Sequence, residues 1–351
     1  MKPATPTDIW FFVGHSIGVT LLGIHTLEAA YFGLPKTERG RLHMVINGDK
    51  RGIYADMIAQ YPHITLVTIS RRSLPALLRI WWGTIGRRQI VLHPLSFGKV
   101  NRIHAIVTRL ITLPSRRSQS VIFGEETFSN RFFFSTVLPR NLTQSIFLSQ
   151  ADAIATTGIV PNRVQPHLLF GLTKPLLMFD GRPYIVVHPF ASSVSRSLPT
   201  ERWEELLQWL TTTYPQYSIV ISGGPADRIA ALSLIKPMFT NVFFSEDIVN
   251  SFLAKMELIG RAALYVGVDT GPTHIAAHVG VSTVVIGNNS NPCWLPYYNP
   301  QVKILMNLSV CTCQGDKTGD CFEYRDGVKY YRCLFSIPQT EIQAAIKKTL
   351  T

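Results

Sequence analysis

Residues with the chemistry to bind a phosphorylated sugar lie between Ala263 and Ile286. The segment from Asp269 to His274 reads Asp-Thr-Gly-Pro-Thr-His and separates two short apolar runs, which are typical of buried parallel strands. Its threonine, glycine and proline are residue types that begin a helix after a tight turn. A helix N-terminus offers free N–H groups to a diphosphate, and an acid at a strand end can bind sugar hydroxyls. The sequence therefore predicts a diphosphate and sugar site, with an ordinary capped helix as the alternative, at Asp269, Thr270, Gly271, Pro272, Thr273 and His274.

Two other turns follow apolar runs in the same half of the chain. After Tyr217 to Ser222, the pair Gly223-Gly224 permits close approach of the backbone to a ligand, and Asp227 opens the next helix. After the run Tyr184 to His188, a polar loop carries the hydroxyl of Ser192. The helix that follows is expected to begin with Thr200 as its cap. Because all three turns follow strands, we expect them at one edge of a parallel sheet, where ligands bind.

Four cysteines near the end of the chain could hold a structural zinc or iron: Cys311, Cys313, Cys321 and Cys333. Their spacing, with one, seven and eleven residues between neighbours, differs from the paired C-x-x-C pattern of a zinc ribbon. The alternative is four reduced cysteines in a surface hairpin.

The motifs D-T-G-P-T-H-I-A-A, V-V-I-G and P-C-W-L-P, which begin at Asp269, resemble the donor-site signature of the bacterial ADP-heptose:lipopolysaccharide heptosyltransferases. The resemblance implies an α/β chain of GT-B architecture, with two doubly wound Rossmann-like domains facing across a cleft. It further implies an inverting transfer from ADP-heptose to an anionic lipopolysaccharide core acceptor, with no metal required for catalysis.

The resemblance extends to the turns before this motif. The family's His-Pro-Gly-Ala loop matches His188 to Ala191, with Phe190 in the glycine position. Arg196 stands in the position of the family's lysine, keeps its charge and suits a diphosphate. Asp227 lies about where the family carries an acid near the nucleotide ribose.

One departure affects catalysis. The family's first turn reads roughly Ser-Leu-Gly-Asp, and its aspartate is the proposed general base, whereas this chain has Ser16-Ile17-Gly18-Val19. Valine cannot accept the proton of the acceptor hydroxyl. His15, in the same turn, is the nearest titratable substitute, and His25 and Glu28 are weaker candidates. His15 could equally be a turn histidine without function, and the protein a non-catalytic relative.

The first half of the chain is strongly basic. Residues 1–165 contain 19 Lys and Arg against 8 Asp and Glu, while the rest of the chain is nearly balanced. Such a domain favours an anionic partner. The segment Arg71 to Arg88 combines five arginines with Trp81 and Trp82. It could lie on the anionic inner face of the membrane, as a peripheral contact, or be an interior helix edged by arginines.

Composition excludes several protein classes. Of the 351 residues 46% are hydrophobic, which indicates a globular protein. No apolar run approaches the ~18 residues of a membrane-spanning helix, and Ile9 to Ile24 lacks the features of a signal peptide. Five cysteines do not make a secreted disulfide scaffold, so we expect a cytoplasmic protein. The chain has no Asp-x-Asp pair and no P-loop pattern, which argues against a metal-dependent transferase of the other main fold and a P-loop kinase.

We predict four parts of the chain. These are a basic acceptor-binding domain (1–165), a linker (166–182), a donor-binding domain with a cysteine-rich tail (183–336) and a C-terminal helix (337–351), which could pack back on the first domain. The predicted function is transfer of a heptose in lipopolysaccharide biosynthesis, with no nucleic acid as partner. The alternatives are a non-catalytic, lipid-binding or nucleic-acid-binding relative, or a transferase for another nucleotide-sugar.

Overall fold

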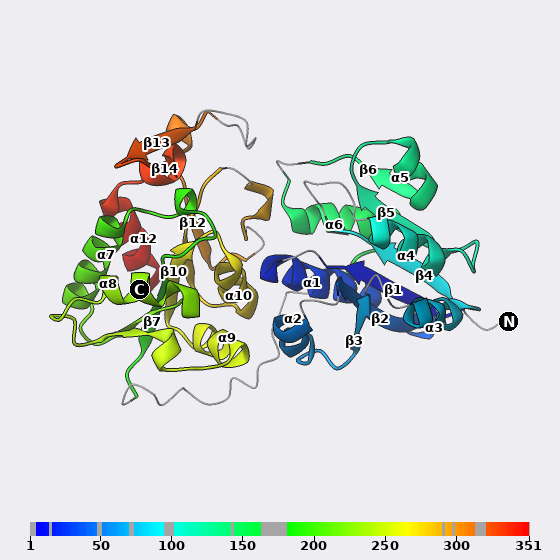
Figure 1. The fold of residues 1–351 in the computed structure, drawn as a ribbon, viewed down its shortest axis with the longest axis horizontal. Coiled ribbons are helices and arrows are strands. Elements are labelled where there is room, and N and C mark those ends of the chain that lie inside the picture. The colour runs from blue at the N-terminus through cyan, green and yellow to red at the C-terminus, as the bar shows by residue number, and fades with distance from the viewer. Residues whose placement is uncertain are drawn as a thin grey trace. The chain divides into compact units, whose positions relative to one another are not determined.

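A computed structural model of the chain forms two compact units, Met1–Pro166 and His167–Thr351 (Figure 1). It describes residues 5–13, 16–47, 51–69, 74–94, 102–141, 144–162, 181–289, 292–296, 299–312 and 321–350. Most of the predicted linker lies outside these residues, so the predicted domain limits stay a prediction, as does the cleft.

The first unit is built on a parallel sheet of six strands in the order β3-β2-β1-β4-β5-β6. The chain runs outward from β1 to β3 and then returns past β1 to β4, so its direction reverses between β1 and β4, as in a doubly wound domain. The strands are β1 (Thr7–Phe12), β2 (Arg39–Asn47), β3 (Ile64–Ile69), β4 (Arg88–Leu92), β5 (Gln119–Phe123) and β6 (Thr136–Leu138). The helices are α1 (Ile17–Gly33), α2 (Arg51–Ile58), α3 (Leu74–Thr84), α4 (Arg102–Thr112), α5 (Phe128–Phe133) and α6 (Ile146–Ala155).

Strand β1 lies at the centre of this sheet and is buried along its whole length. On one of its faces, Trp10 and Phe12 pack into a cluster with Val45 of β2, Val91 of β4 and Val107 of α4. Because helices cover both faces of the sheet, the side chains on both faces of β1 are buried. The run Ile-Trp-Phe-Phe-Val is therefore apolar throughout and does not alternate between apolar and polar residues.

The amino end of this sheet contains a buried charge. Asp8 is fully buried and accepts hydrogen bonds from the side chains of Arg41 and Arg87, each with a shortest separation of 2.8 Å. Burial alone would raise the pKa of the Asp8 carboxyl, but these bonds outweigh burial and lower it. The carboxylate is therefore ionised and joins β1 to β2 and to the turn before β4.

The second unit has a parallel sheet of six strands in the order β12-β11-β10-β7-β8-β9, and its chain direction reverses between β10 and β7. Its strands are β7 (Tyr184–His188), β8 (Ser218–Ile221), β9 (Val242–Phe244), β10 (Leu264–Val268), β11 (Thr283–Ile286) and β12 (Val302–Leu305), with an antiparallel hairpin of β13 (Phe322–Arg325) and β14 (Val328–Tyr331). Its helices are α7 (Thr200–Thr213), α8 (Arg228–Leu234), α9 (Phe252–Gly260), α10 (Gly271–Val279), α11 (Arg332–Phe335) and α12 (Gln339–Leu350).

Two expectations about helices in this unit differ from the structure. Pro199 is the N-cap residue of α7, and Thr200 is already the first residue of the helix, so it is not the cap. The C-terminal helix α12 packs on the second sheet, with Ile342 and Ile346 fully buried in the core that Leu206 of α7 and Val284 of β11 share.

Helix α3 carries the described part of the arginine-rich and tryptophan-rich segment. Leu78 and Trp82 of α3 are exposed, as is Ile85 directly after the helix, and Trp82 has 73% of its surface accessible to solvent. This side of α3 is therefore not an interior face of the first unit. No helix in the described ranges is long and apolar enough to cross a membrane.

Candidate functional site

The predicted donor residues come from neighbouring strands at the centre of the second sheet. Strands β7 and β10 pair in parallel with Gly267 opposite His188, so the turns after both strands begin at the same edge and level. Asp269 follows β10, and the loop with Ser192 and Arg196 follows β7. The chain direction of the sheet reverses between these two strands, which is where open α/β sheets bind ligands.

Helix α10 begins at this point with an N-terminus that no side chain caps. Thr270 occupies the N-cap position, but its hydroxyl donates to Val268 O at 3.3 Å instead of accepting from the helix. The first helical bond runs from His274 N to Thr270 O at 3.3 Å. Within the described part of the chain, the N–H groups of Gly271 and Thr273 have no acceptor, and Pro272 has no N–H. The expected cap is therefore absent, and two N–H groups and the helix dipole remain for an anion.

A buried hydroxyl network fixes this turn. Thr273 donates to Val268 O at 2.5 Å, and the Tyr265 hydroxyl lies 3.2 Å from Thr273 Oγ1. Because the Thr273 hydrogen is directed to Val268 O, the Tyr265 hydroxyl is the donor to Thr273. A Cβ atom at Gly267 would lie only 2.8 Å from the Tyr265 ring, so glycine at this position lets the tyrosine reach the turn.

Asp269 and His274 face each other across the turn. His274 Nε2 lies 3.7 Å from Asp269 Oδ1, and both residues are more than nine-tenths buried. Burial lowers the pKa of His274, and the Asp269 carboxyl opposes that shift without cancelling it. The imidazole is therefore neutral at neutral pH and places no positive charge beside the carboxylate.

Arg196 lies in a short 3-10 turn (Val194–Arg196) after β7. Its guanidinium donates to Ser192 Oγ, so the two predicted residues are in contact. The Ser197 hydroxyl donates to Pro189 O at 2.5 Å and accepts from Trp203 Nε1 at 3.0 Å. These two bonds hold the loop against α7, which limits the positions that Arg196 can take.

The glycine pair after β8 has a structural role. Gly223 N donates to Ser245 Oγ at 3.1 Å, and Gly224 N donates to Asp227 Oδ2 at 2.8 Å. A Cβ atom on Gly223 would lie 3.0–3.1 Å from the side chains of Phe244, Asp227 and Phe190. One carboxylate oxygen of Asp227 thus caps its own turn, and Phe190 packs over Gly223. A ligand role for Gly223, Gly224 and Asp227 stays a prediction.

The departure from the family's Ser-Leu-Gly-Asp turn lies just after the carboxyl end of β1 in the first unit. His15 and Gly14 lie outside the described residues. Ser16 caps α1 by accepting a hydrogen bond from Val19 N at 3.2 Å, and Val19 is buried in the first turn. The helix thus keeps its expected start, and an apolar side chain takes the position of the family's carboxylate.

The sequence reasoning missed two histidines at this edge. His93 directly follows β4, the neighbour of β1, and stacks on Phe12 at 4.6 Å between ring centroids. His104, in the first turn of α4, lies 5.0 Å from the same phenylalanine ring. His93 is fully enclosed, and burial, together with His104, lowers its pKa to about 3. His93 is therefore a neutral packing group, whereas the half-buried His104 is a candidate proton acceptor. The sequence signal that could have drawn attention to this edge is the position of His93 directly after a buried strand.

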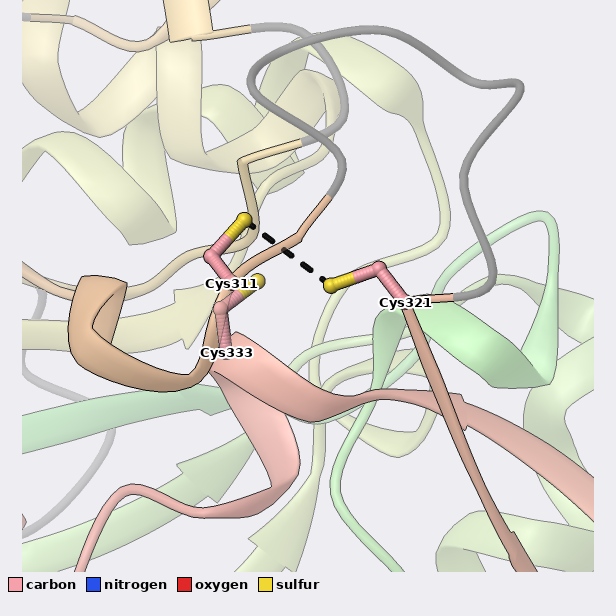
Figure 2. Close-up of side chains that lie close together, drawn as sticks. All are labelled: Cys311, Cys321 and Cys333. Atoms are coloured by element: carbon pink, nitrogen blue, oxygen red, sulfur yellow. Dashed lines mark hydrogen bonds between the residues drawn. The ribbon is translucent and has the colours of Figure 1, made fainter.

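Three of the four cysteines converge (Figure 2). The sulfur atoms of Cys311, Cys321 and Cys333 all lie within 4.8 Å of one another, and those of Cys311 and Cys321 are 3.8 Å apart. A tetrahedral thiolate site with metal–sulfur bonds of ~2.3 Å separates its sulfurs by about 3.8 Å. Cys321 and Cys333 are buried, so they are not cysteines of a surface hairpin. Cys313, the expected fourth ligand, lies outside the described residues.

Asn289 connects this cluster to the edge of the second sheet. Its backbone N–H donates to Cys333 Sγ and its side-chain amide to Cys311 Sγ, both at 3.3 Å. The residue lies three positions after β11, the strand beside β10. Burial and the neighbouring sulfurs Cys311 and Cys321 raise the pKa of Cys333 to about 11, and a bound cation would reverse that shift. The residues therefore fit a thiophilic metal with N–H donors to its ligands.

Comparison with known proteins agrees with this geometry. Residues 163–322, just under half of the chain, match the model of glycosyltransferase family 9 (heptosyltransferase). The chain carries a heptosyltransferase-family domain. The matched residues include every predicted donor residue from Ser192 to His274, and the predicted family and glycosyltransferase class are confirmed. No curated protein sequence matches the chain.

Solved structures confirm the GT-B fold of this glycosyltransferase. A family 9 glycosyltransferase from Veillonella parvula has a TM-score of 0.74 at 17% identity, covering 100% of this chain and 98% of that one. ADP-heptose lipopolysaccharide heptosyltransferase II from E. coli has a TM-score of 0.72 at 13% identity, covering 98% of each. The dodecameric, iron-containing heptosyltransferase TibC, in complex with ADP-D-beta-D-heptose, has a TM-score of 0.59 at 14% identity, covering 100% of this chain and 79% of that one.

We expect the purified glycosyltransferase to contain about one zinc or iron per chain and to melt at a lower temperature after strong chelation, because metal binding is coupled to folding. Cys333→Ser should lose most of the metal. Elemental analysis and melting curves measure both effects.

The matched control is Cys293→Ala, which removes a buried thiol outside the cluster and should leave the metal content unchanged. Metal-free protein whose melting curve does not respond to a chelator would contradict the assignment.

Proposed function

We propose that this glycosyltransferase moves a heptose from ADP-heptose to an anionic lipopolysaccharide core acceptor, with inversion and without a metal in the transfer step. The observation that supports the proposal most strongly is the uncapped N-terminus of α10 beside Asp269, between the central strands β10 and β7. Anionic diphosphates bind at such helix ends, and the sugar they carry then lies beside the acid. Structural relatives include an ADP-heptose heptosyltransferase and a complex with ADP-D-beta-D-heptose.

Each donor residue has a task in this proposal. The N–H groups of Gly271 and Thr273 bind the diphosphate, and the Asp269 carboxylate accepts hydrogen bonds from the sugar hydroxyls. Arg196 neutralises the charge that develops on ADP as it leaves, which is the step that needs electrostatic stabilisation. His274, neutral through burial, positions Asp269. None of these tasks uses a metal; a zinc or iron at the cysteines stabilises the loop that contains Asn289.

The acceptor belongs to the first unit in this proposal. That unit carries most of the net charge of +12, which favours a phosphorylated glycolipid. Such an acceptor is made at the inner face of the inner membrane, so we propose a cytoplasmic protein with peripheral membrane contact. The exposed Trp82 of α3 and Ile85, which directly follows that helix, support this contact.

The proton of the acceptor hydroxyl needs a base, and Val19 cannot provide one. Two histidines are candidates: His15, which follows β1 by three residues in the sequence, and His104, whose ring lies beside that of Phe12. Glu28 is a poorer candidate because it is buried and pairs with His63 at 3.0 Å. The buried Val19 favours one alternative function, a relative that binds donor or lipid without transferring sugar.

Asp269→Ala should abolish transfer from ADP-heptose, by roughly 10²–10³-fold or more, because one lost contact to the reacting sugar has that effect. ADP should still stabilise the variant, whereas the additional stabilisation by ADP-heptose over ADP should disappear. Activity assays and ligand-dependent melting curves measure the two effects.

Glu205→Ala is the matched control, because it removes one exposed carboxylate from α7, outside the proposed site. A folded Asp269→Ala protein with normal transfer would rule out the donor site as assigned here.

Replacing the true base, His15 or His104, by alanine should reduce turnover by roughly 10²–10⁴-fold and remove the ascending limb of the pH–rate profile. ADP affinity should not change, because the proposed donor residues belong to the second unit. Val19→Asp should partly restore turnover in the slow variant, since an acid is favoured in the first turn of a helix.

Normal turnover in both histidine variants would transfer the role to another group, such as the exposed Glu125 after β5. A wild-type protein that binds ADP-heptose but transfers nothing to any core acceptor would favour the non-catalytic alternative.

A further inference from the structure

A cavity of ≈ 970 Å³ opens at the amino edge of the first sheet. It is formed where β1, β4 and β5 begin and where α6 ends. Three of its residues are arginines, one is an acid, and the others are small or uncharged polar residues. The lining consists of Thr5, Thr7, Glu38, Arg88, Arg116, Arg117, Gln119, Thr156, Thr157 and Gly158.

This cavity is separate from the proposed acceptor site. In a parallel sheet, the residues before the strands lie at the opposite edge from the residues after them. His93 and the turn after β1 lie at the carboxyl edge, whereas Arg88 and Thr7 are the first residues of β4 and β1. Strands of five to six residues separate the two edges by about 15–20 Å. A ligand in the cavity therefore does not occupy the transfer site.

Some arginines at this edge have a structural explanation. Arg39 donates to Phe32 O and Leu34 O at the end of α1, and Arg41 donates to Gly83 O near the end of α3. The carbonyl groups at helix C-termini attract cations, so these side chains complete the fold. Positive charge at this edge alone would not indicate a ligand.

Arg88 also has a partly structural role. Its Nη2 donates to Thr157 O at 2.6 Å, beyond the end of α6, and to Gln119 Oε1 at 2.8 Å. Both bonds use one nitrogen, and the other guanidinium nitrogens of Arg88 donate to no acceptor within the described ranges. The two bonds hold the guanidinium in place at the cavity, so little side-chain entropy is lost when a ligand binds.

Arg116 and Arg117 have no such explanation. Both are exposed in the turn between α4 and β5, and neither side chain has an acceptor or an acidic partner among the residues that the structure describes. The turn itself is ordered, since Arg117 N donates to Ser115 Oγ at 3.3 Å and Ser118 N to Ser115 O at 3.0 Å. These two charges line a cavity and make no side-chain contact within the described ranges.

Thr7 provides an independent observation. It lines the cavity, it is fully buried, and its hydroxyl has no hydrogen-bond partner in the described part of the protein. Buried hydroxyl groups are normally paired, because an unpaired one loses its bonds to water. Because this hydroxyl is closed to solvent, it is a polar group within the cavity wall and not itself a contact for the ligand.

We propose that this cavity binds a phosphate-bearing anion. Guanidinium groups bind phosphate oxygens in pairs of parallel hydrogen bonds. The lining of the cavity contains three guanidinium groups and a single carboxylate, that of Glu38, so its net charge is positive. The hydroxyl group of Thr5 and the amide group of Gln119 supply further contacts to oxygen atoms. The volume is in the range of organic ligand sites, so the cavity has room for a phosphate ester.

Two sources could provide that phosphate ester, a lipid headgroup or a soluble compound. Exposed apolar side chains at the same edge favour the lipid. Trp82 and Ile85 lie at the end of α3. Hydrogen bonds from the side chains of Arg41 and Gln89 to backbone carbonyls hold this end of α3 at the amino edge of the sheet. Leu113, also exposed, follows α4 just before Arg116. Arginines next to exposed tryptophan and aliphatic side chains are typical of proteins that contact anionic membranes.

Arginine-directed labelling with phenylglyoxal, mapped by mass spectrometry of the whole protein, tests the proposal at the residues concerned. Glycerol phosphate, or vesicles of phosphatidylcholine containing phosphatidylglycerol, should protect Arg116 and Arg117 from labelling. Vesicles of phosphatidylcholine alone should not protect them. Arg182, exposed in the second unit, is the internal reference. The measurement needs no donor, acceptor or turnover, so it is independent of the proposed function.

The double variant Arg116→Ala/Arg117→Ala should bind the protecting ligand at least about tenfold more weakly in a direct binding assay, because two charge-assisted contacts are lost. The matched control Arg182→Ala/Lys303→Ala removes the same charge from exposed positions of the second unit and should bind normally. Neither the labelling experiment nor the binding assay requires a nucleotide ligand.

Protection by glycerol phosphate supports a soluble phosphate ester, and protection only by the anionic vesicles supports a lipid headgroup. Labelling of Arg116 and Arg117 that neither probe reduces, or equal binding by the double variant and the control, would overturn the proposal.

Discussion

The uncapped N-terminus of α10 is the constraint on which the site depends. Thr270 and Thr273 both direct their hydroxyls to Val268 O, so neither accepts from the helix. A missing cap costs a helix about 0.5–2 kcal/mol. This uncapped helix end lies where β10 and β7 are side by side, and a bound anionic ligand would offset the lost stability. Binding of a diphosphate and stability of the second unit are therefore coupled.

Much of this arrangement could be predicted from the sequence. The apolar runs and their turn residues placed Asp269 after a strand and α10 after a tight turn, because local patterns determine both elements. The two doubly wound domains, by contrast, were implied by the resemblance to the heptosyltransferases. The resemblance in the Asp269 to Trp294 region then selected one family, and the family model matches that region.

Other features depend on contacts that the sequence does not reveal. Thr270 has the residue type of a cap, yet a competing carbonyl acceptor takes its hydroxyl. Cys311, Cys321 and Cys333 are far from a standard metal spacing, and only the packing of α11 beside the loop after β11 brings their sulfurs together. His104 is one polar position of an amphipathic helix in the sequence, and its proximity to Phe12 follows from the pairing of β1 with β4.

Ligand-dependent stability of the second unit, with ADP compared with adenosine, tests the central claim most directly. If the helix end and Arg196 bind a diphosphate, ADP should raise the melting temperature of the wild-type protein clearly more than adenosine does. In Arg196→Ala that difference should shrink, while the small effect of adenosine should persist. Equal stabilisation by ADP and adenosine, or no stabilisation by ADP, would contradict the account.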